Sequence, residues 1–147
     1  MAATDPEAQR LFAASLAAHD ARETARSIEL ARQAIERDPQ HAEALEHLGT
    51  LLITRRQRYA EGLAFVERAL AAREDDAGLW YSLGWCREFA AHEIRRRGAG
   101  DESLDPKALY GLAADAFRRC LALRPEGKLV DDAEDLLDHV ENELTSM

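Results

Sequence analysis

The chain has 147 residues, of which 46% are apolar and 32% are charged. This composition indicates one globular domain with a hydrophobic core, and it excludes a disordered chain or one built mainly of membrane-spanning helices. Because 19 Lys and Arg stand against 28 Asp and Glu, the net charge is −9. We therefore expect neither nucleic acid nor a membrane surface to be a partner.

The N-terminal segment and the absence of a long apolar run favour a cytoplasmic location. The first seven residues lack a basic start and an apolar stretch, and no run of eighteen apolar residues occurs. Cys86 and Cys120 have no C-x-x-C spacing and fall at apolar helix positions. We interpret both as reduced core residues, since free cysteine behaves as a small buried hydrophobe.

The first predicted helix ends at about Asp20, and the second spans about 22–37. Asp5 and Pro6 are typical of a helix start, with Asp as the N-cap and Pro at the first helical position. The second helix carries small and apolar side chains on one stripe and ends before Pro39.

The next two helices lie within about 40–74. Leu45, Leu48 and Leu52 follow the spacing i, i+3, i+7 on the first, and Val66 lies on a similar stripe of the second. Gly49 allows the two helices to approach closely. Gly62, inside the second helix, should cost about 1 kcal/mol relative to Ala.

The third pair is longer. Its first helix continues to Arg97, about 21 residues or ~32 Å, where the glycine-rich segment Gly98–Ser103 breaks it. Asp105 and Pro106 open the second helix. One further helix carries a single apolar stripe on an acidic background, typical of a capping helix. The stripe consists of Leu129, Ala133, Leu136, Leu137, Val140 and Leu144.

These pairs repeat. The hexapeptide Leu79–Gly84 (LWYSLG) has a weaker counterpart 35 positions earlier, in Ala44–Gly49 (ALEHLG). A second block follows each, with the same spacing of 3, 4, 3 and 1 residues. These blocks are Tyr59, Gly62, Val66, Ala69, Leu70 and Tyr110, Ala113, Phe117, Cys120, Leu121. A period in the middle thirties built from two helices indicates a helical-hairpin repeat.

The pattern resembles the tetratricopeptide repeat (TPR), with Trp, Leu-Gly and Tyr on its first helix and Ala, Phe and Ala on its second. The resemblance implies an all-α, single-domain fold of three stacked hairpins in a right-handed superhelix, with an elongated third hairpin and a C-terminal capping helix. The repeats would span about 6–39, 40–74 and 75–125, the third with some 17 inserted residues, and the capping helix about 128–145. By the family's spacing, Leu11, Ala14 and Ser15 stand where Trp80, Leu83 and Gly84 stand later, so the first repeat is degenerate.

The sequence shows little that indicates catalysis. It contains no H-E-x-x-H, phosphate-binding or nucleophile-elbow motif, and the five histidines are not spaced as metal ligands. We expect no enzyme activity, no metal and no cofactor. A minor helical enzyme or metal-binding domain is the alternative from a different class.

Six arginines lie at the ends of first helices or in the turns after them, which would place them along one edge of stacked hairpins. They are Arg55, Arg56, Arg58, Arg95, Arg96 and Arg97. Cations at helix C-termini complement the helix dipole, so this basic edge is explained either by helix stability or by an acidic partner.

The resemblance also implies a concave groove, because ligand contacts in TPR proteins come mostly from the inner face of each first helix. The corresponding residues here are Phe12, Leu16, Glu43, Glu46, Thr50, Ile53, Tyr81, Trp85, Glu88 and Phe89. Some family members clamp a partner's C-terminal carboxylate with Lys and Asn at such positions, and neither occurs here. An aromatic and acidic groove instead suits an apolar or basic peptide or helix, unless Phe12, Leu16, Trp85 and Phe89 serve as packing residues.

The sequence thus predicts a non-catalytic protein-interaction module, a scaffold or adaptor with a protein or peptide partner. A small TPR chaperone for a secreted or assembling protein is the alternative within the same fold. The sequence leaves a homo-oligomer open.

Overall fold

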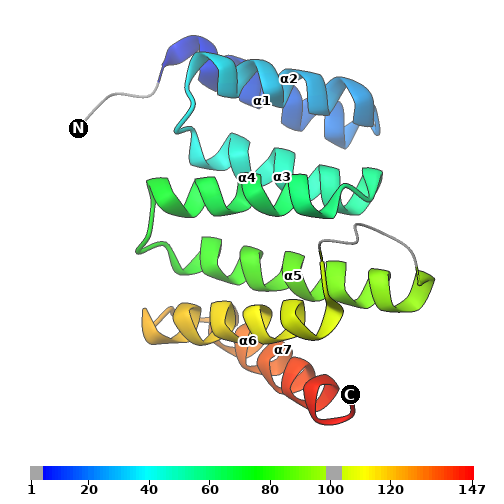
Figure 1. The fold of residues 1–147 in the computed structure, drawn as a ribbon. Helices are drawn as coiled ribbons and strands as arrows, with labels where there is room; N and C mark the ends of the chain where they lie inside the picture. The colour runs from blue at the N-terminus through cyan, green and yellow to red at the C-terminus, as the bar shows by residue number, and fades with distance from the viewer. Residues whose placement is uncertain (1–4, 99–103) are drawn as a thin grey trace.

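The structure is a computed structural model that describes residues 5–98 and 104–147 (Figure 1). Within these ranges every regular element is a helix, which confirms the all-α prediction. The helices are α1 (Pro6–Asp20), α2 (Thr24–Arg37), α3 (Ala42–Arg56), α4 (Tyr59–Ala72), α5 (Ala77–Arg97), α6 (Pro106–Ala122) and α7 (Lys128–Thr145). None of these helices is long and apolar enough to cross a membrane.

The helices form three hairpins, α1–α2, α3–α4 and α5–α6, which stack in chain order (Figure 1). The third hairpin is elongated, as predicted: α5 has 21 residues and α6 has 17, whereas α1 to α4 have 14 or 15. The last helix, α7, packs mainly against α6 and also contacts α5. It therefore covers the end of the stack, as a capping helix does.

Aspartate caps begin three of the helices. The Asp5 carboxylate accepts hydrogen bonds from the amides of Glu7 and Ala8 at 2.9 and 3.1 Å, and Pro6 follows it. Asp105 uses the same arrangement before Pro106, and Asp76 caps α5 without a proline. These carboxylates accept hydrogen bonds from amides that have no partner inside the helix, so they fix where each helix starts.

One helix starts later than predicted. We expected the second helix from about residue 22, but α2 begins at Thr24. Arg22 adopts a left-handed conformation with φ of 62°, and the Glu23 amide bonds to the Ala18 carbonyl at 2.8 Å. This closes a tight turn between α1 and α2 and keeps Arg22 out of the helix.

At the other predicted break, α5 ends at Arg97 and Gly98 closes it. Gly98 has φ of 63°, and its amide bonds to the Ile94 carbonyl at 2.9 Å. A left-handed residue at this position favours glycine. The rest of the predicted glycine-rich segment, 99–103, lies outside the described residues.

Small residues lie where the helices of each hairpin come closest. In the first hairpin, Ser15 and Ser27 are fully buried; each hydroxyl donates to the other residue's carbonyl, at 2.7 and 2.8 Å. In the third, a Cβ atom on Gly84 would lie 2.7 Å from the ring of Phe117. The side chains at these positions therefore set the distance between the helices.

The second hairpin changes our interpretation of Gly62. A Cβ atom on Gly62 would lie 2.6 Å from the Gly49 carbonyl oxygen and 2.5 Å from Ile53 Cγ1. From the sequence we expected Gly62 only to lower the stability of its helix relative to Ala. In the fold, an alanine side chain would clash there. Glycine has a lower helix propensity, but it allows α3 and α4 to approach more closely than alanine would.

Both cysteines are free and buried, as predicted. Burial raises the pKa of the Cys86 thiol to about 12, which keeps it protonated at neutral pH.

Candidate functional site

A pocket of about 290 Å³ opens between α3 and α5, and we call it the α3–α5 pocket. Its lining residues are Thr50 on α3 and Tyr81, Ser82, Trp85 and Cys86 on α5. The α5 residues lie at i, i+1, i+4 and i+5, and that spacing places them on one side of a helix. Thr50, Tyr81 and Trp85 are groove residues of the sequence prediction; Ser82 and Cys86 are not.

Two aromatic residues, Tyr81 and Trp85, line this pocket, and each packs against a further ring. Trp85 and Phe89, one helical turn apart, are stacked with ring centroids 5.3 Å apart and an interplanar angle of 16°. Both rings are partly buried and pack against the core. Tyr81 lies 5.9 Å from the ring of Phe117 on α6, which holds it against the third hairpin. The indole ring of Trp85 thus packs against Phe89 and also lines the open pocket.

The half-buried carboxylate of Glu46 on α3 is bonded to Ser82, one of the residues that line the pocket. The Ser82 hydroxyl donates to Glu46 Oε2, and Thr50 Oγ1 donates to the Glu46 carbonyl oxygen at 2.9 Å. Burial raises the pKa of the Glu46 carboxyl above its ordinary value, the Ser82 bond lowers it, and the charges of Asp76 and Glu43 raise it further. The two linked helices therefore hold a carboxylate in surroundings that disfavour its charge.

Two predicted groove residues are core residues in this fold. Phe12 is 6% exposed and Ile53 is fully buried, so neither side chain is available to a partner. Leu16, by contrast, is 40% exposed. Glu43 is also exposed and pairs with Arg73 at 3.6 Å.

The capping helix contacts the last predicted acidic groove residue. Glu88 on α5 lies 3.5 Å from His139 Nε2 on α7, and Arg95 pairs with Glu143 of α7 at 2.6 Å. The side chain of Glu88 is 16% exposed. At this end of α5 the inner face is therefore partly covered by α7.

Comparison with known proteins addresses the fold. No protein-family model matches the chain, and no curated protein does either. Among solved structures, the first TPR of Spaghetti (RPAP3), bound to the HSP90 peptide SRMEEVD, superposes with a TM-score of 0.72 at 15% identity, over 95% of this chain and 94% of that one. The Arabidopsis OM64 TPR domain gives a TM-score of 0.67 at 15% identity, over 92% of this chain and 94% of its own.

The chain has the tetratricopeptide-repeat fold. A third structure, the N-terminal domain of stress-induced protein-1 (STI-1) from C. elegans, agrees at a TM-score of 0.60 and 17% identity, over 92% of this chain and 98% of that one. In this TPR fold α1, α3 and α5 are the first helices of the three repeats. The α3–α5 pocket thus lies between the first helices of repeats two and three.

Four of the six arginines of the predicted basic edge pair with carboxylates of the same chain. The pairs are Arg58–Glu61, Arg95–Glu143, Arg96–Glu93 and Arg97–Glu93. Arg55 and Arg56 form no ion pair with any residue in 5–98 or 104–147. The helices α3 and α5, which carry the edge, end on the same side of the TPR stack (Figure 1).

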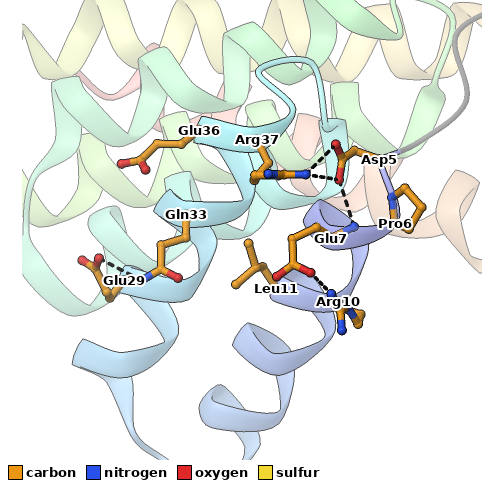
Figure 2. A pocket seen from close by; sticks show the side chains of 9 residues that line it. All are labelled: Asp5, Pro6, Glu7, Arg10, Leu11, Glu29, Gln33, Glu36 and Arg37. Carbon is orange, nitrogen blue, oxygen red and sulfur yellow. Dashed lines mark hydrogen bonds and ion pairs between the residues drawn. The ribbon is translucent and has the colours of Figure 1, made fainter.

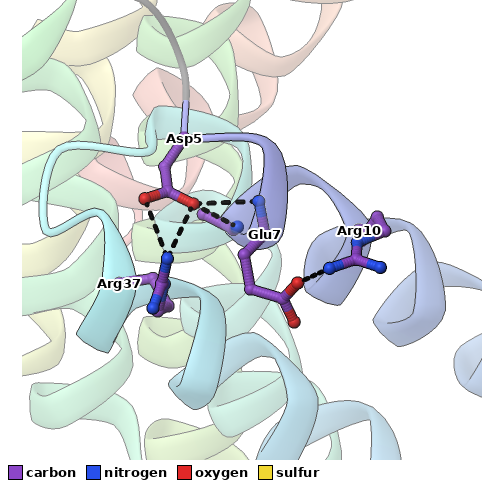
Figure 3. A network of polar contacts seen from close by, with 5 residues as sticks. Asp5, Glu7, Arg10 and Arg37 are labelled. Atoms are coloured by element: carbon purple, nitrogen blue, oxygen red, sulfur yellow. Dashed lines mark hydrogen bonds and ion pairs between the residues drawn. The ribbon is translucent and has the colours of Figure 1, made fainter.

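A larger hollow, of about 1140 Å³, lies on the first TPR hairpin, between α1 and α2 (Figure 2). Leu11 lies between the polar side chains of α1 and those of α2 there. The polar groups that line the hollow largely pair with one another. Arg37 bonds to the Asp5 carboxylate at 3.3 Å, and Arg10 pairs with Glu7 (Figure 3). Asp5 thus both caps α1 and ties it to α2, and we interpret this hollow as structural.

A histidine network that the sequence did not indicate lies at the junction of α1, α2 and α3. His47 Nε2 lies 3.1 Å from the Ser27 hydroxyl, and the His47 ring is 5.4 Å from that of His19. Burial, followed by the nearby His19, lowers the pKa of His47. Ser27 is fully buried, so this Ser–His contact has no open face for a substrate. In the described part of the chain, no three His, Cys, Asp or Glu side chains gather as metal ligands would.

Proposed function

We propose that the chain is a non-catalytic protein-interaction module that binds a peptide or helix of a partner protein along the inner faces of α3 and α5. The α3–α5 pocket is the observation that carries this proposal. It combines an open cavity, a supported indole ring and a half-buried carboxylate on two adjacent first helices. Large rings in concave sites of this kind act as anchors in protein interfaces.

The side chains around the pocket favour an apolar or basic segment. Trp85 lines the pocket and stacks on Phe89, and Leu16, outside the pocket lining on the first helix of repeat one, is an exposed leucine. Glu46 and Glu43 on α3 make this face acidic, which attracts Lys and Arg and repels Asp and Glu. Phe12 and Ile53 do not belong to the proposed contact surface, because they are buried.

This chemistry differs from recognition of an acidic tail. The peptide bound by the first TPR of Spaghetti (RPAP3), SRMEEVD, carries two Glu and one Asp near its C-terminus. The chain has no Lys or Asn at the groove positions where some TPR proteins clamp a carboxylate, and it has Glu43 and Glu46 there instead. We therefore propose that peptides of this acidic type are not its ligands.

A selection experiment tests the proposal. A random peptide display library is panned on the immobilised wild-type protein and then depleted on the Trp85→Ala protein, so that only peptides needing Trp85 remain. We expect the retained peptides to be rich in apolar residues and in Lys or Arg. A library that yields no Trp85-dependent peptide, or yields mainly acidic ones, would contradict the proposal.

Other expectations stay predictions. A small chaperone for a secreted or assembling protein would use the same pocket, and its client would compete with the selected peptides. An acidic partner along the six-arginine basic edge and a cytoplasmic location are likewise predictions from the sequence, which leaves a homo-oligomer open.

A further inference from the structure

We propose that the α3–α5 pocket receives one lysine or arginine side chain of the partner, with the carboxylate of Glu46 as its counter-charge and Trp85 as the wall against its aliphatic stem. This inference rests on the proposed function and specifies what the pocket recognises.

Apolar and polar groups follow one another in order along the pocket. Trp85 and Cys86 lie one turn further along α5 than Ser82, whose hydroxyl bonds to Glu46. A side chain that lies along α5 from Trp85 toward Ser82 would therefore meet apolar surface first and the Ser82–Glu46 pair second. Lysine and arginine have this sequence of groups, an aliphatic stem followed by a cation. A cation near the face of an indole ring gains further attraction from the ring.

The carboxylate of Glu46 has capacity for further hydrogen bonds. Ser82 donates to Glu46 Oε2, and Oε1 accepts no hydrogen bond from any residue in 5–98 or 104–147. A carboxylate accepts two or more hydrogen bonds, and those from charged donors are the strongest. An ammonium or guanidinium group would complete the set that the fold leaves open.

The charged groups around Glu46 are mainly acidic. Glu43 on the same helix and Asp76, the N-cap of α5, are the other acidic groups that act on it, and Arg73 after α4 is the basic one. Arg73 pairs with Glu43 at 3.6 Å rather than with Glu46. Since two further carboxylates and only one arginine surround it, a partner's cation would find a negative site without a direct cationic competitor.

The same surroundings predict a pH dependence. Burial and the neighbouring carboxylates raise the pKa of Glu46, whereas a bound cation lowers it by favouring the charged form. The bound complex therefore holds the proton of Glu46 less tightly than the free protein does. Affinity for a cationic side chain should fall as the pH is lowered through the raised pKa of Glu46.

Other occupants fit less well. An apolar side chain would remove water from Glu46 without replacing its hydrogen bonds, which is unfavourable for a carboxylate. An acidic side chain would meet three carboxylates. A cationic side chain combines an aliphatic stem for the apolar wall with charged donors for the carboxylate, and hydrogen bonds from charged donors are the strongest.

The experiment uses four sub-libraries of acetylated, amidated octapeptides with Lys, Arg, norleucine or Glu fixed at one central position and all other positions randomised. Binding to wild-type, Glu46→Gln, Glu43→Gln and Trp85→Ala proteins is measured by fluorescence polarisation at pH 7 and pH 5. Glu46→Gln keeps the size of the side chain and an acceptor for Ser82 and removes the charge. Glu43→Gln removes the same charge from an exposed neighbour that pairs with Arg73, so it separates the general charge of this face from a direct contact with Glu46.

We expect wild-type protein to bind the Lys and Arg sub-libraries at least ten-fold more tightly than the norleucine one, with a smaller ratio at pH 5. Glu46→Gln should abolish this preference, and Glu43→Gln should retain it. Equal binding of Lys and norleucine sub-libraries, both lost in Trp85→Ala, would overturn the cation pocket and leave the proposed function standing. An unchanged preference in Glu46→Gln together with a lower melting temperature would assign Glu46 to the fold alone. Peptide affinities that are the same for the wild-type and Trp85→Ala proteins would instead refute the proposed function.

Discussion

The contact between Gly49 and Gly62 yields a prediction that reverses the ordinary effect of a helix substitution. Gly62→Ala adds a methyl group 2.6 Å from a backbone oxygen and 2.5 Å from a carbon of Ile53, which is fully buried. Neither neighbour has an open side into which to move. Overpacking of this kind costs about 1–3 kcal/mol, and the better helix propensity of alanine returns up to about 1 kcal/mol. We therefore expect Gly62→Ala to destabilise the fold by up to about 2 kcal/mol, and not to stabilise it.

Gly111 provides the matched control. It also lies inside a helix, α6, but a Cβ atom there would meet nothing within 4 Å. Gly111→Ala should therefore stabilise the protein by about 0.5–1 kcal/mol. Urea unfolding followed by circular dichroism measures both, and equal m-values would show that the unfolded states are comparable. If Gly62→Ala stabilises the protein as much as Gly111→Ala does, the close approach of α3 and α4 is refuted.

Three further predictions concern the core, the histidine network and the ligand. Leu83 is 1% exposed, so Leu83→Ala should lower the free energy of unfolding, measured with urea, by about 2–5 kcal/mol. A loss below about 1 kcal/mol would contradict its place in the core. Because burial lowers the pKa of His47 below 6.5, the unfolded chain takes up the proton more readily, so the free energy of unfolding should fall as pH drops below about 6.5 through the lowered pKa. His47→Gln should flatten this pH dependence and His92→Gln, at an exposed site, should leave it; the reverse would disprove the assignment. The peptide SRMEEVD should show no calorimetric binding at millimolar concentration, and a micromolar Kd would contradict the acidic character of the groove.

The helices could be predicted from the sequence because their signals are local. Asp5 with Pro6 and Asp105 with Pro106 define helix starts through neighbouring residues alone, and Gly98 marks the end of α5 in the same way. The left-handed Arg22 has no such signal, since non-glycine residues adopt this conformation only when the surrounding turn requires it. The start of α2 was therefore placed too early.

The candidate site was predictable only in part. The repeat register identified Thr50, Tyr81 and Trp85, which line the α3–α5 pocket. It did not separate these from Phe12 and Ile53, because burial of a residue on a first helix depends on side chains supplied by other helices. The requirement for Gly62 was missed for the same reason, as it arises from a helix crossing that the propensity of one helix does not reveal.

The most direct test of the proposed groove is the affinity of the Trp85→Ala protein for a peptide selected on the wild type, measured by titration calorimetry. Trp80→Ala is the control, because Trp80 is also partly exposed on α5 but faces away from the pocket, with its Nε1 bonded to the Glu74 carbonyl at 2.8 Å and Arg119 over its ring. We predict that Trp85→Ala weakens binding by at least ~2 kcal/mol, about 30-fold, with a melting temperature no lower than that of Trp80→Ala. A Trp85→Ala protein that melts many degrees lower and yet keeps its affinity would identify the indole as a core residue and contradict the proposed groove.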